Sequence, residues 1–366
     1  MALGKAPVCR SFASMWTGCD APVTVAATGL SWLEALPPWP LDGFGTGRMR
    51  TLLERLGNPQ RRFDAVHVVG TNGKSTATRR IARTIGGPAY TSPHVAGWHE
   101  RLDTDPDGFA RAVERVRADA EAVGATQFEA VTAAAFADFA ERADVAAIEA
   151  GLGGRNDATN VLDARVVLLT NVELEHTDVL GDTREAIARE KLAVAAPGAV
   201  VVLPDGEFAP LLPANDLRIG GAREAASAFL GRDVELAEAV LPGRLELREG
   251  GAEVRDGAHT PEAIEWLLER LPEPRDYVVV ASILGDKNVD GMLARLARAG
   301  STLVATRSSS PRARPAEDVA AAAQPFFARI EREPDPHAAV ALARRLGPRI
   351  LVTGSLYLLA DLSADQ

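Results

Sequence analysis

Cysteine is almost absent from this chain of 366 residues, which has only Cys9 and Cys19, both near its start. So few cysteines exclude a disulfide framework, and their placement offers no spacing that suits a metal site. We therefore expect a protein of a reducing compartment and place it in the cytoplasm.

Long apolar runs and an excess of positive charge are missing as well. No apolar stretch approaches the ~18 residues that a membrane span requires, and residues 1–30 lack a basic start followed by a continuous apolar region. We expect no membrane partner, and a disordered or extended tail over residues 1–30. The formal net charge of −10 argues against nucleic acid held by bulk charge. A small-molecule enzyme fits this composition better, and we expect it to be a monomer.

The chain is longer than a single core usually grows, so two domains are expected. Apolar runs typical of strands alternate with alanine-rich or amphipathic stretches typical of helices, which predicts mostly parallel sheets covered by helices. The expected strands are 65–69, 144–148, 165–169 and 199–203, and, after a break at Leu241-Pro242-Gly243, 277–283, 302–306 and 349–353. We predict an α/β protein, with one domain over 31–243 and a smaller Rossmann-like α/β domain over 244–366.

A glycine-rich turn joins the first expected strand to a helix-compatible stretch, Ala77 to Ile85. This order of strand, glycine loop and helix is typical of phosphate-binding loops, and it predicts a P-loop-type ATPase domain that binds ATP with Mg²⁺. Two residues separate the glycines instead of the usual four, so an ordinary strand-to-helix turn is the alternative. The nucleotide-binding residues are expected to be Gly70, Thr71, Asn72, Gly73, Lys74, Ser75 and Thr76.

Two polar residues follow further expected strands and should lie at the carboxyl edge of the sheet, where open α/β sheets bind ligands. Glu149 could hold Mg²⁺ there, or it could be a solvated strand end. His176 could be functional or structural. The glycines after Glu149 have the wrong spacing for a dinucleotide fingerprint, so we reject NAD. His94 and His99 are five residues apart, which does not suit a helical zinc motif.

Three more polar residues have ordinary structural explanations. Lys191 lies in a stretch that reads as an exposed helix of mixed charge, and by default it is a solvated lysine. Asp256 and His259 lie on a turn before a helix, where simple capping is an alternative to a functional role.

These stretches together resemble the folylpolyglutamate synthase and dihydrofolate synthase family, a branch of the Mur ligase superfamily. The resemblance runs from about Trp32 to Leu362. The matching stretches are Leu36 to Trp39, Leu53 to Pro59, Gly70 to Lys74, Tyr90 to His94, Glu149 to Asn160, His176-Thr177, Gly181 to Thr183, Ala188 to Lys191, Pro242 to Glu246, Asp256 to His259, Asp286-Lys287 and Val352 to Tyr357. So many motifs in one order argue against chance similarity.

The resemblance implies an ATP-dependent amide ligase. Such an enzyme phosphorylates the carboxylate of a pterin-containing substrate, dihydropteroate or a (tetrahydro)folate polyglutamate, and the amine of L-glutamate attacks the acyl phosphate. Phosphoryl transfer needs positioned cations more than covalent groups on the protein. Lys74 would serve this purpose together with Mg²⁺. The magnesium ligands implied by the motifs are Ser92, Glu149 and His176, assisted by Ser75 or Thr76.

The same resemblance assigns roles to the remaining candidates. Lys191 matches a lysine that is carbamylated in the family. Carbamylation turns a cation into a carboxylate-like metal ligand, and a second Mg²⁺ is then an open alternative. Arg244 and Asp256 match nucleotide contacts made by the linker and the second domain. His259 would help to place glutamate or the acyl phosphate.

The chain departs from the family pattern at several positions. Gly73-Lys74-Ser75-Thr76 replaces the usual Gly-Lys-Gly-Ser, Glu224 stands where an adenine-contacting asparagine is expected, and Thr260 replaces an asparagine. The segment from Arg101 to Phe109, part of which normally helps to form the pterin pocket, is short, as is the region from Asp205 to Gly221. Two alternatives therefore stay open: a Mur-type amino-acid ligase with a different acyl substrate, and a nucleotide-binding regulator without ligase activity.

Overall fold

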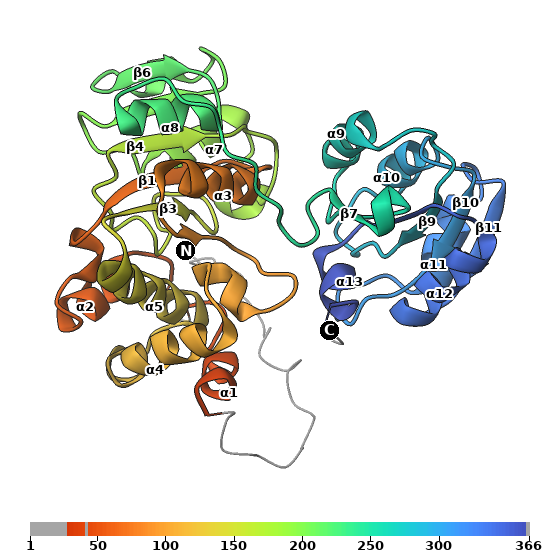
Figure 1. The fold of residues 1–366 in the computed structure, drawn as a ribbon, viewed down its shortest axis with the longest axis horizontal. Helices are drawn as coiled ribbons and strands as arrows, with labels where there is room; N and C mark the ends of the chain where they lie inside the picture. Colours follow the sequence, from red (N-terminus) through yellow and green to blue (C-terminus); the bar gives the residue numbers. More distant parts are fainter. Residues whose placement is uncertain (1–27, 41–42, 364–366) are drawn as a thin grey trace, which may run out of the picture.

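Two six-stranded sheets, each covered by helices, make up the computed structural model, which describes residues 28–40 and 43–363 (Figure 1). An extended segment between them carries the chain from one sheet to the other. In the first part the helices are α1 (Thr28–Ala35), α2 (Gly47–Arg55), α3 (Lys74–Ile85), α4 (Pro106–Val123), α5 (Gln127–Arg142), α6 (Thr177–Leu180), α7 (Arg184–Leu192) and α8 (Ala222–Leu230). Its strands are β1 (Asp64–Val69), β2 (Ala89–Tyr90), β3 (Val145–Glu149), β4 (Val166–Leu169), β5 (Val200–Leu203) and β6 (Asp216–Ile219).

The second part is built in the same way. Its strands are β7 (Glu246–Arg248), β8 (Glu253–Arg255), β9 (Val278–Ala281), β10 (Thr302–Ala305), β11 (Arg329–Arg332) and β12 (Ile350–Thr353). Its helices are α9 (Pro261–Arg270), α10 (Val289–Leu296), α11 (Ala316–Ala323), α12 (Pro336–Leu346) and α13 (Leu356–Asp361). Short 3₁₀ helices lie at Pro59–Arg61, Trp98–Leu102, Ala209–Leu211 and Glu249–Gly251. No helix in these described ranges is long and apolar enough to cross a bilayer.

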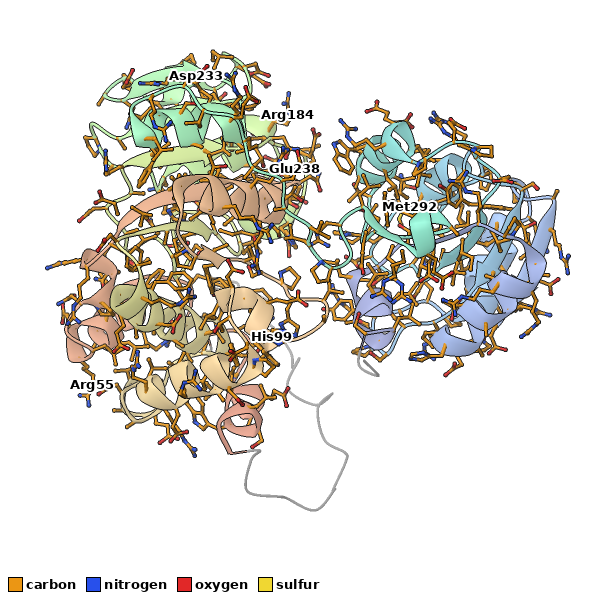
Figure 2. The ribbon with its side chains drawn as sticks, viewed as in Figure 1. Arg55, His99, Arg184, Asp233, Glu238 and Met292 are labelled. Atoms are coloured by element: carbon orange, nitrogen blue, oxygen red, sulfur yellow. The ribbon has the colours of Figure 1, made fainter. Side chains whose placement is uncertain are left out.

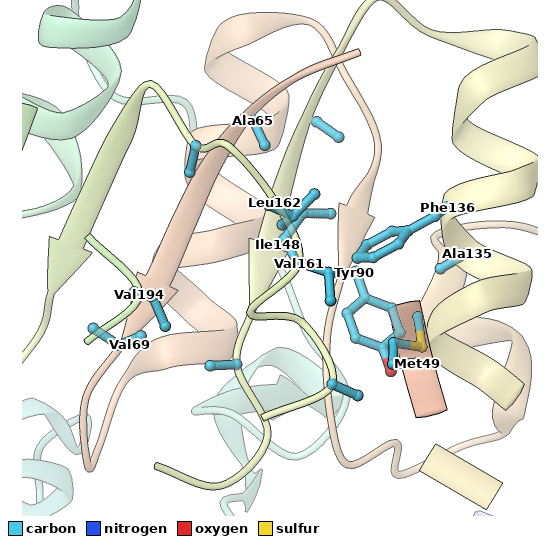
Figure 3. Close-up of a cluster of buried hydrophobic side chains, with 14 of the residues drawn as sticks. Met49, Ala65, Val69, Tyr90, Ala135, Phe136, Ile148, Val161, Leu162 and Val194 are labelled. Atoms are coloured by element: carbon cyan, nitrogen blue, oxygen red, sulfur yellow. The ribbon is translucent and has the colours of Figure 1, made fainter. Parts of the chain in front are cut away.

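The first sheet has the strand order β2-β3-β1-β4-β5-β6, and all of its pairs are parallel. Successive side chains of β1 point to opposite faces, as the twofold period of a strand requires. Ala65 and Val69 pack in the core formed with α4 and α5, whereas Val66 and Val68 pack under α3 and α8. Figure 3 shows part of the first core, where the rings of Phe136 and Tyr90 lie near Met49.

Local sequence signals explain where several helices begin. The Thr126 hydroxyl accepts from the backbone N–H of Glu129, and the Glu129 carboxylate accepts in return from the N–H of Thr126, which forms a capping box at the start of α5. Asp105 caps α4 by accepting from the N–H of Gly108. These caps satisfy backbone donors that the first helical turn leaves without partners.

The second sheet has the order β11-β10-β9-β12-β8-β7, with parallel pairs except for the antiparallel pair β7 and β8. Helices α9, α10 and α11 cover one face and α12 and α13 the other. Met292 of α10 lies inside this domain (Figure 2).

One side chain of the first domain belongs to the core of the second. Val95 is buried in the cluster that contains Leu358 and Leu359 of α13. Gly243 lies against the same contact, since an added Cβ there would stand 2.6 Å from Leu359 Cδ1 and 3.3 Å from Val95 Cγ2. The close approach at Gly243 therefore lets the linker pass between the two domains at this contact.

The predicted α/β class and the mostly parallel sheets are confirmed, and all seven expected strands exist within a few residues of their predicted bounds. The sequence did not predict the short strands β2, β6, β7, β8 and β11, because two to four residues with little apolar alternation carry a weak signal. Residues 1–27 of the predicted tail lie outside the described residues. The prediction is wrong for its last three residues, since α1 begins at Thr28.

Candidate active site

The carboxyl ends of β1, β3 and β4 meet at the centre of the first sheet, because β1 lies between the other two. The chain leaves β1 through the predicted phosphate loop. Gly70 has φ 144°, and an added Cβ would lie 1.9 Å from Thr170 Oγ1 just after β4. Gly73 has φ 79° at the N-cap of α3. Both glycines are therefore required, one by close packing and the other by a left-handed backbone.

The phosphate loop is braced by the segment that follows β4. Asn171 Oδ1 accepts from the backbone N–H groups of Thr71 and Asn72 at 3.2 and 2.8 Å, and the Thr170 hydroxyl donates to the Asn72 carbonyl at 2.8 Å. Lys74 Nζ donates to the carbonyls of Gly70 and Thr71 at 3.0 and 3.2 Å. Sequence reasoning missed Thr170 and Asn171 as supports, although their position directly after a buried strand was the available signal.

Glu149 ends β3 and is only 2% exposed, so the solvated strand end considered from the sequence is wrong. Its Oε1 accepts from the Ser75 hydroxyl at 3.1 Å and its Oε2 from the backbone N–H of Ser92 at 3.0 Å. Burial raises the pKa of Glu149, while Lys74, the two hydrogen bonds and Arg244 oppose that rise. Within the described residues, no cationic nitrogen lies at ion-pair distance from this carboxylate.

The two hydroxyl residues of the loop have different surroundings. Ser75 is 7% exposed and faces Glu149, whereas Thr76 is half-buried and makes no hydrogen bond to that carboxylate. Since they are neighbours at the start of α3, the helix turns their side chains about 100° apart. Ser75 is consequently the hydroxyl that the fold places beside Glu149.

Lys191 is 2% exposed, so the solvated lysine expected from the mixed-charge stretch is wrong. Its Nζ donates to the Gly70 carbonyl at 2.9 Å and to Glu175 Oε1 at 2.9 Å. Burial lowers the pKa of Lys191, and Glu175 counteracts this. Helix α7 comes close to the loop after β3 because Gly154 has no side chain: a Cβ there would lie 2.4 Å from the Lys191 carbonyl oxygen.

His176 follows β4, as predicted, and is exposed at the N-cap of α6 with φ 47° and ψ 42°. The structure does not join it to Glu149 by a hydrogen bond, and it joins Ser92 to that carboxylate through its backbone N–H rather than its hydroxyl. Among the residues that the structure describes, no three His, Cys, Asp or Glu side chains are grouped so as to hold a metal ion. The predicted ligand set is thus only partly assembled, around Ser75, Ser92 and Glu149.

The linker and second domain supply the remaining candidates. Asp256 is buried and accepts from the backbone N–H groups of Leu245 at 2.7 Å and Ala258 at 2.8 Å. Capping is not its role, because Thr260 caps α9. His259 Nδ1 lies 2.8 Å from the Gly257 carbonyl. Since a carbonyl only accepts, Nδ1 carries the proton and donates it.

Burial lowers the pKa of His259, with the Gly257 carbonyl opposing and Lys287 and Arg244 adding to the effect, so Nε2 is an unprotonated acceptor. Arg244 acts electrostatically on both Glu149 and His259. It also lines a cavity of about 260 Å³, together with Ser75, His99 and Leu241. His99 is labelled in Figure 2. The start of α3, the segment after β2 and the linker therefore line one partly open pocket.

Residues 68–207 match the Mur ligase middle domain, and residues 243–356 match the glutamate ligase domain of Mur ligases. The two matches cover the phosphate loop with its sheet edge and the linker with the second sheet. The fold and the site thus define a Mur-type ligase.

Individual relatives narrow this class. The folylpolyglutamate synthase of Lacticaseibacillus casei is 30% identical over 85% of this chain and 92% of its own length. The dihydrofolate synthase/folylpolyglutamate synthase of Escherichia coli is 31% identical over 74% of this chain and 79% of its own. A bifunctional folylpolyglutamate synthase/dihydrofolate synthase of Yersinia pestis, solved with AMPPNP and Mn ion, superposes with a TM-score of 0.79 at 26% identity, covering 94% of this chain and 99% of that one. The chain belongs to the dihydrofolate synthase/folylpolyglutamate synthase family.

The Lys191–Glu175 pair yields a stability prediction. Glu175→Gln leaves the Lys191 ammonium buried without a counter-charge, which lowers its pKa further. We expect a loss of roughly 3 kcal/mol or less in the free energy of unfolding at pH 7, since Glu175 is partly exposed. A lysine whose pKa is lower in the folded state makes stability rise with pH. The loss should therefore shrink as the pH rises toward the pKa of an unfolded lysine.

Urea denaturation at pH 7 and pH 10 measures this effect. The control is Glu175→Gln combined with Lys191→Met, which removes the buried charge and should recover much of the lost stability. Equal stability of Glu175→Gln and the unmodified protein at pH 7 would show that the pair does not compensate a buried charge.

Proposed function

We propose that this chain is an ATP-dependent ligase that activates the carboxylate of a pterin-containing acid and joins it to L-glutamate. The observation that carries this proposal is the contact between the phosphate-loop residue Ser75 and the buried carboxylate of Glu149, on which Arg244 of the linker acts electrostatically. The names of the relatives support both the glutamate and the folate or dihydropteroate substrates.

In the first step a carboxylate oxygen of the acid attacks the γ-phosphorus of ATP, the bond to the β-phosphate oxygen breaks, and ADP leaves. The phosphate loop would hold the phosphates with its backbone N–H groups at the positive end of α3. Lys74 would exchange its bonds to the loop carbonyls for bonds to phosphate oxygens, which compensates the charge that develops between the β- and γ-phosphates.

In the second step the amine of glutamate attacks the acyl carbon, the bond to the phosphate oxygen breaks, and the amine loses a proton. The unprotonated Nε2 of His259 is suited to accept that proton or to orient the amine. Its tautomer is set by the Gly257 carbonyl, so the turn before α9 determines what this side chain can do. The pocket beside Arg244 is partly open, and closure of the second domain over it would limit hydrolysis of the acyl phosphate by water.

The residues at the end of β3 fit a magnesium ion. A buried carboxylate without an ion pair favours a cation, and the Ser75 hydroxyl and Glu149 are oxygen donors of the kind that Mg²⁺ prefers. We propose these two as ligands, with the Ser92 hydroxyl and His176 reaching the ion only after local movement. Bound there, Mg²⁺ would neutralise phosphate charge during transfer.

Ser75 and Thr76 form a matched pair for testing this assignment. Ser75→Ala should lower kcat by roughly 100-fold, because it removes a donor that neighbours both the phosphates and Glu149. Thr76→Ala should change kcat less than about threefold, since Thr76 faces away from that carboxylate. Steady-state rates at saturating ATP over a range of Mg²⁺ concentrations measure both variants. An equal effect of the two substitutions would remove Ser75 from the metal site.

We also propose that Lys191 becomes carbamylated. Burial favours its neutral amine, which attacks CO₂ to form the N–C bond and releases a proton. The resulting carbamate would stand beside the Glu175 carboxylate that now accepts from the Lys191 ammonium at 2.9 Å. Two adjacent anions repel each other unless a cation lies between them, so carbamylation and binding of a second cation would depend on each other.

Carbamylation has a direct readout. Native mass spectrometry of protein kept in bicarbonate should show the added mass of one CO₂, and Lys191→Ala should lack it. Activity should fall on removal of CO₂ and return with bicarbonate, and Lys191→Ala should lose most of kcat. An active Lys191→Ala enzyme, or no added mass, would contradict the modification.

We propose four further features of this protein. A cytoplasmic location is supported by the scarcity of cysteine, and a monomer by the fact that one chain supplies both sides of the site. Substrates limited to small molecules, without nucleic acid or membrane, agree with the negative net charge. A domain boundary between residues 243 and 244 is supported by Gly243, which lies where the linker meets α13.

The proposed activity is tested by phosphate release with ATP, Mg²⁺ and L-glutamate, in parallel with 7,8-dihydropteroate, tetrahydrofolate or neither, with the products identified by mass. Release with dihydropteroate alone indicates a dihydrofolate synthase, and release with both acids a bifunctional enzyme. Lys74→Ala is the matched control and should fold normally but release no phosphate above background. Release with neither acid would contradict the proposed substrates and favour another Mur-type acyl substrate.

A further inference from the structure

Arg101 lies at the end of the segment that follows β2, beside the candidate site. Its carbonyl accepts from the backbone N–H of Thr91, the residue before Ser92, so the arginine is held next to the loop whose N–H binds Glu149. The side chain is half-buried. The fold thus holds this guanidinium close to the end of β3.

Two contacts fix the orientation of the guanidinium. Arg101 Cζ lies 4.6 Å from the ring centroid of Trp98, a cation–π contact. Arg101 Nε donates to His94 Nδ1 at 3.1 Å. Burial, Arg101 and His99 lower the pKa of His94 to about 3, so this histidine is a neutral acceptor and carries no charge that could pair with the arginine.

The charge of Arg101 has no partner. In the described part of the chain, no carboxylate lies within ion-pair distance of the guanidinium, although most of the other arginines there form such pairs. Burial lowers the pKa of Arg101, and the Tyr90 hydroxyl and the carboxylates of Glu149 and Glu100 oppose this. His94 occupies one edge of the guanidinium and the Tyr90 hydroxyl is a second hydrogen-bond partner, but both groups are neutral, so the planar cation still lacks the carboxylate that its donor geometry suits.

We propose that Arg101 binds the carboxylate of the acyl substrate and presents it for phosphorylation. This inference rests on the proposed function and adds a binding residue to it. A bidentate bond to the carboxylate supplies the counter-charge that Arg101 lacks. Because Arg101 and Glu149 share one neighbourhood, the anchored carboxylate also lies on the side of the sheet where the phosphate loop ends.

The surroundings favour this anion over the others of the reaction. The phosphates of ATP have their own binding groups in the loop, Lys74 and the N-terminus of α3. These groups follow β1, whereas Arg101 lies on the segment after β2. Around Arg101 the neighbours are aromatic. Trp98 stacks on Phe109 with ring centroids 6.2 Å apart, and Tyr90 lies 6.3 Å from Phe128. An aryl carboxylate, an apolar ring that ends in an anion, matches both features.

The test compares two ligands that differ in one charge. Equilibrium dialysis measures the affinity of the protein for 7,8-dihydropteroate and for the same molecule with a neutral carboxamide in place of the carboxylate. The unmodified protein should prefer the carboxylate roughly 10- to 100-fold, as expected for a charge-assisted bidentate contact. Arg101→Gln should bind both ligands about equally, and Arg101→Lys should retain part of the preference.

Arg142→Gln is the matched control. Arg142 also stacks on an aromatic ring, Phe139 at 5.0 Å, and holds the same segment by donating to the Leu102 carbonyl at 2.7 Å, but its charge is already paired with Asp138. This variant should keep the full preference for the carboxylate. In turnover, Arg101→Gln should raise KM for the acid and leave KM for ATP unchanged.

The outcomes separate the inference from the proposed function. If Arg101→Gln keeps the preference, or weakens both ligands by the same factor, Arg101 only supports the loop and the inference is wrong while the ligase function stands. If the unmodified protein binds neither ligand and releases no phosphate with them, the proposed substrate class fails, and this inference fails with it.

Discussion

Burial of the Glu149 carboxylate without a counter-ion is the constraint on which the rest of the site depends. Removing a charge from water is costly unless it is paired or hydrogen-bonded, and Glu149 has two hydrogen bonds but no ion pair. The fold pays this cost at the end of a central strand, next to the phosphate loop. Such a site favours a state in which a cation is bound. The metal that accompanies the nucleotide would therefore compensate the charge of Glu149.

The neighbouring charges follow the same logic. Lys191 is buried with Glu175 as its partner, whereas Arg101 has neutral partners but no carboxylate at ion-pair distance in the described part of the chain. The three groups come from different segments and lie around the ends of β1, β3 and β4. Their charges are only partly compensated within the protein, so substrates and ions complete the compensation. Recognition of anionic substrates and stability of the domain are therefore coupled in this enzyme.

The two domains are also coupled at this place. Val95 lies on the segment that begins at Ser92 and ends at Arg101, and it is buried in the core of the second domain. A movement of the second domain would act on this segment and thereby on the N–H that binds Glu149. In the linker, Gly243 lies against Val95 and Leu359, and Arg244 donates to the Gly243 carbonyl. The geometry of the acidic site thus depends on the position of the second domain.

The sequence by itself determined the α/β class, the order of the main strands, the phosphate loop and the positions of Glu149 and His176 at strand ends. These features follow from hydrophobic periodicity and from glycines with a local backbone role, both of which are properties of neighbouring residues. Only the tertiary structure decided that Lys191 is buried against Glu175, that Ser75 rather than Thr76 faces Glu149, and that Arg101 has no carboxylate partner among the described residues. Burial and pairing depend on contacts between segments far apart in the chain, such as the hydrogen bond from Lys191 to the Gly70 carbonyl. Local sequence patterns contain no information about such contacts.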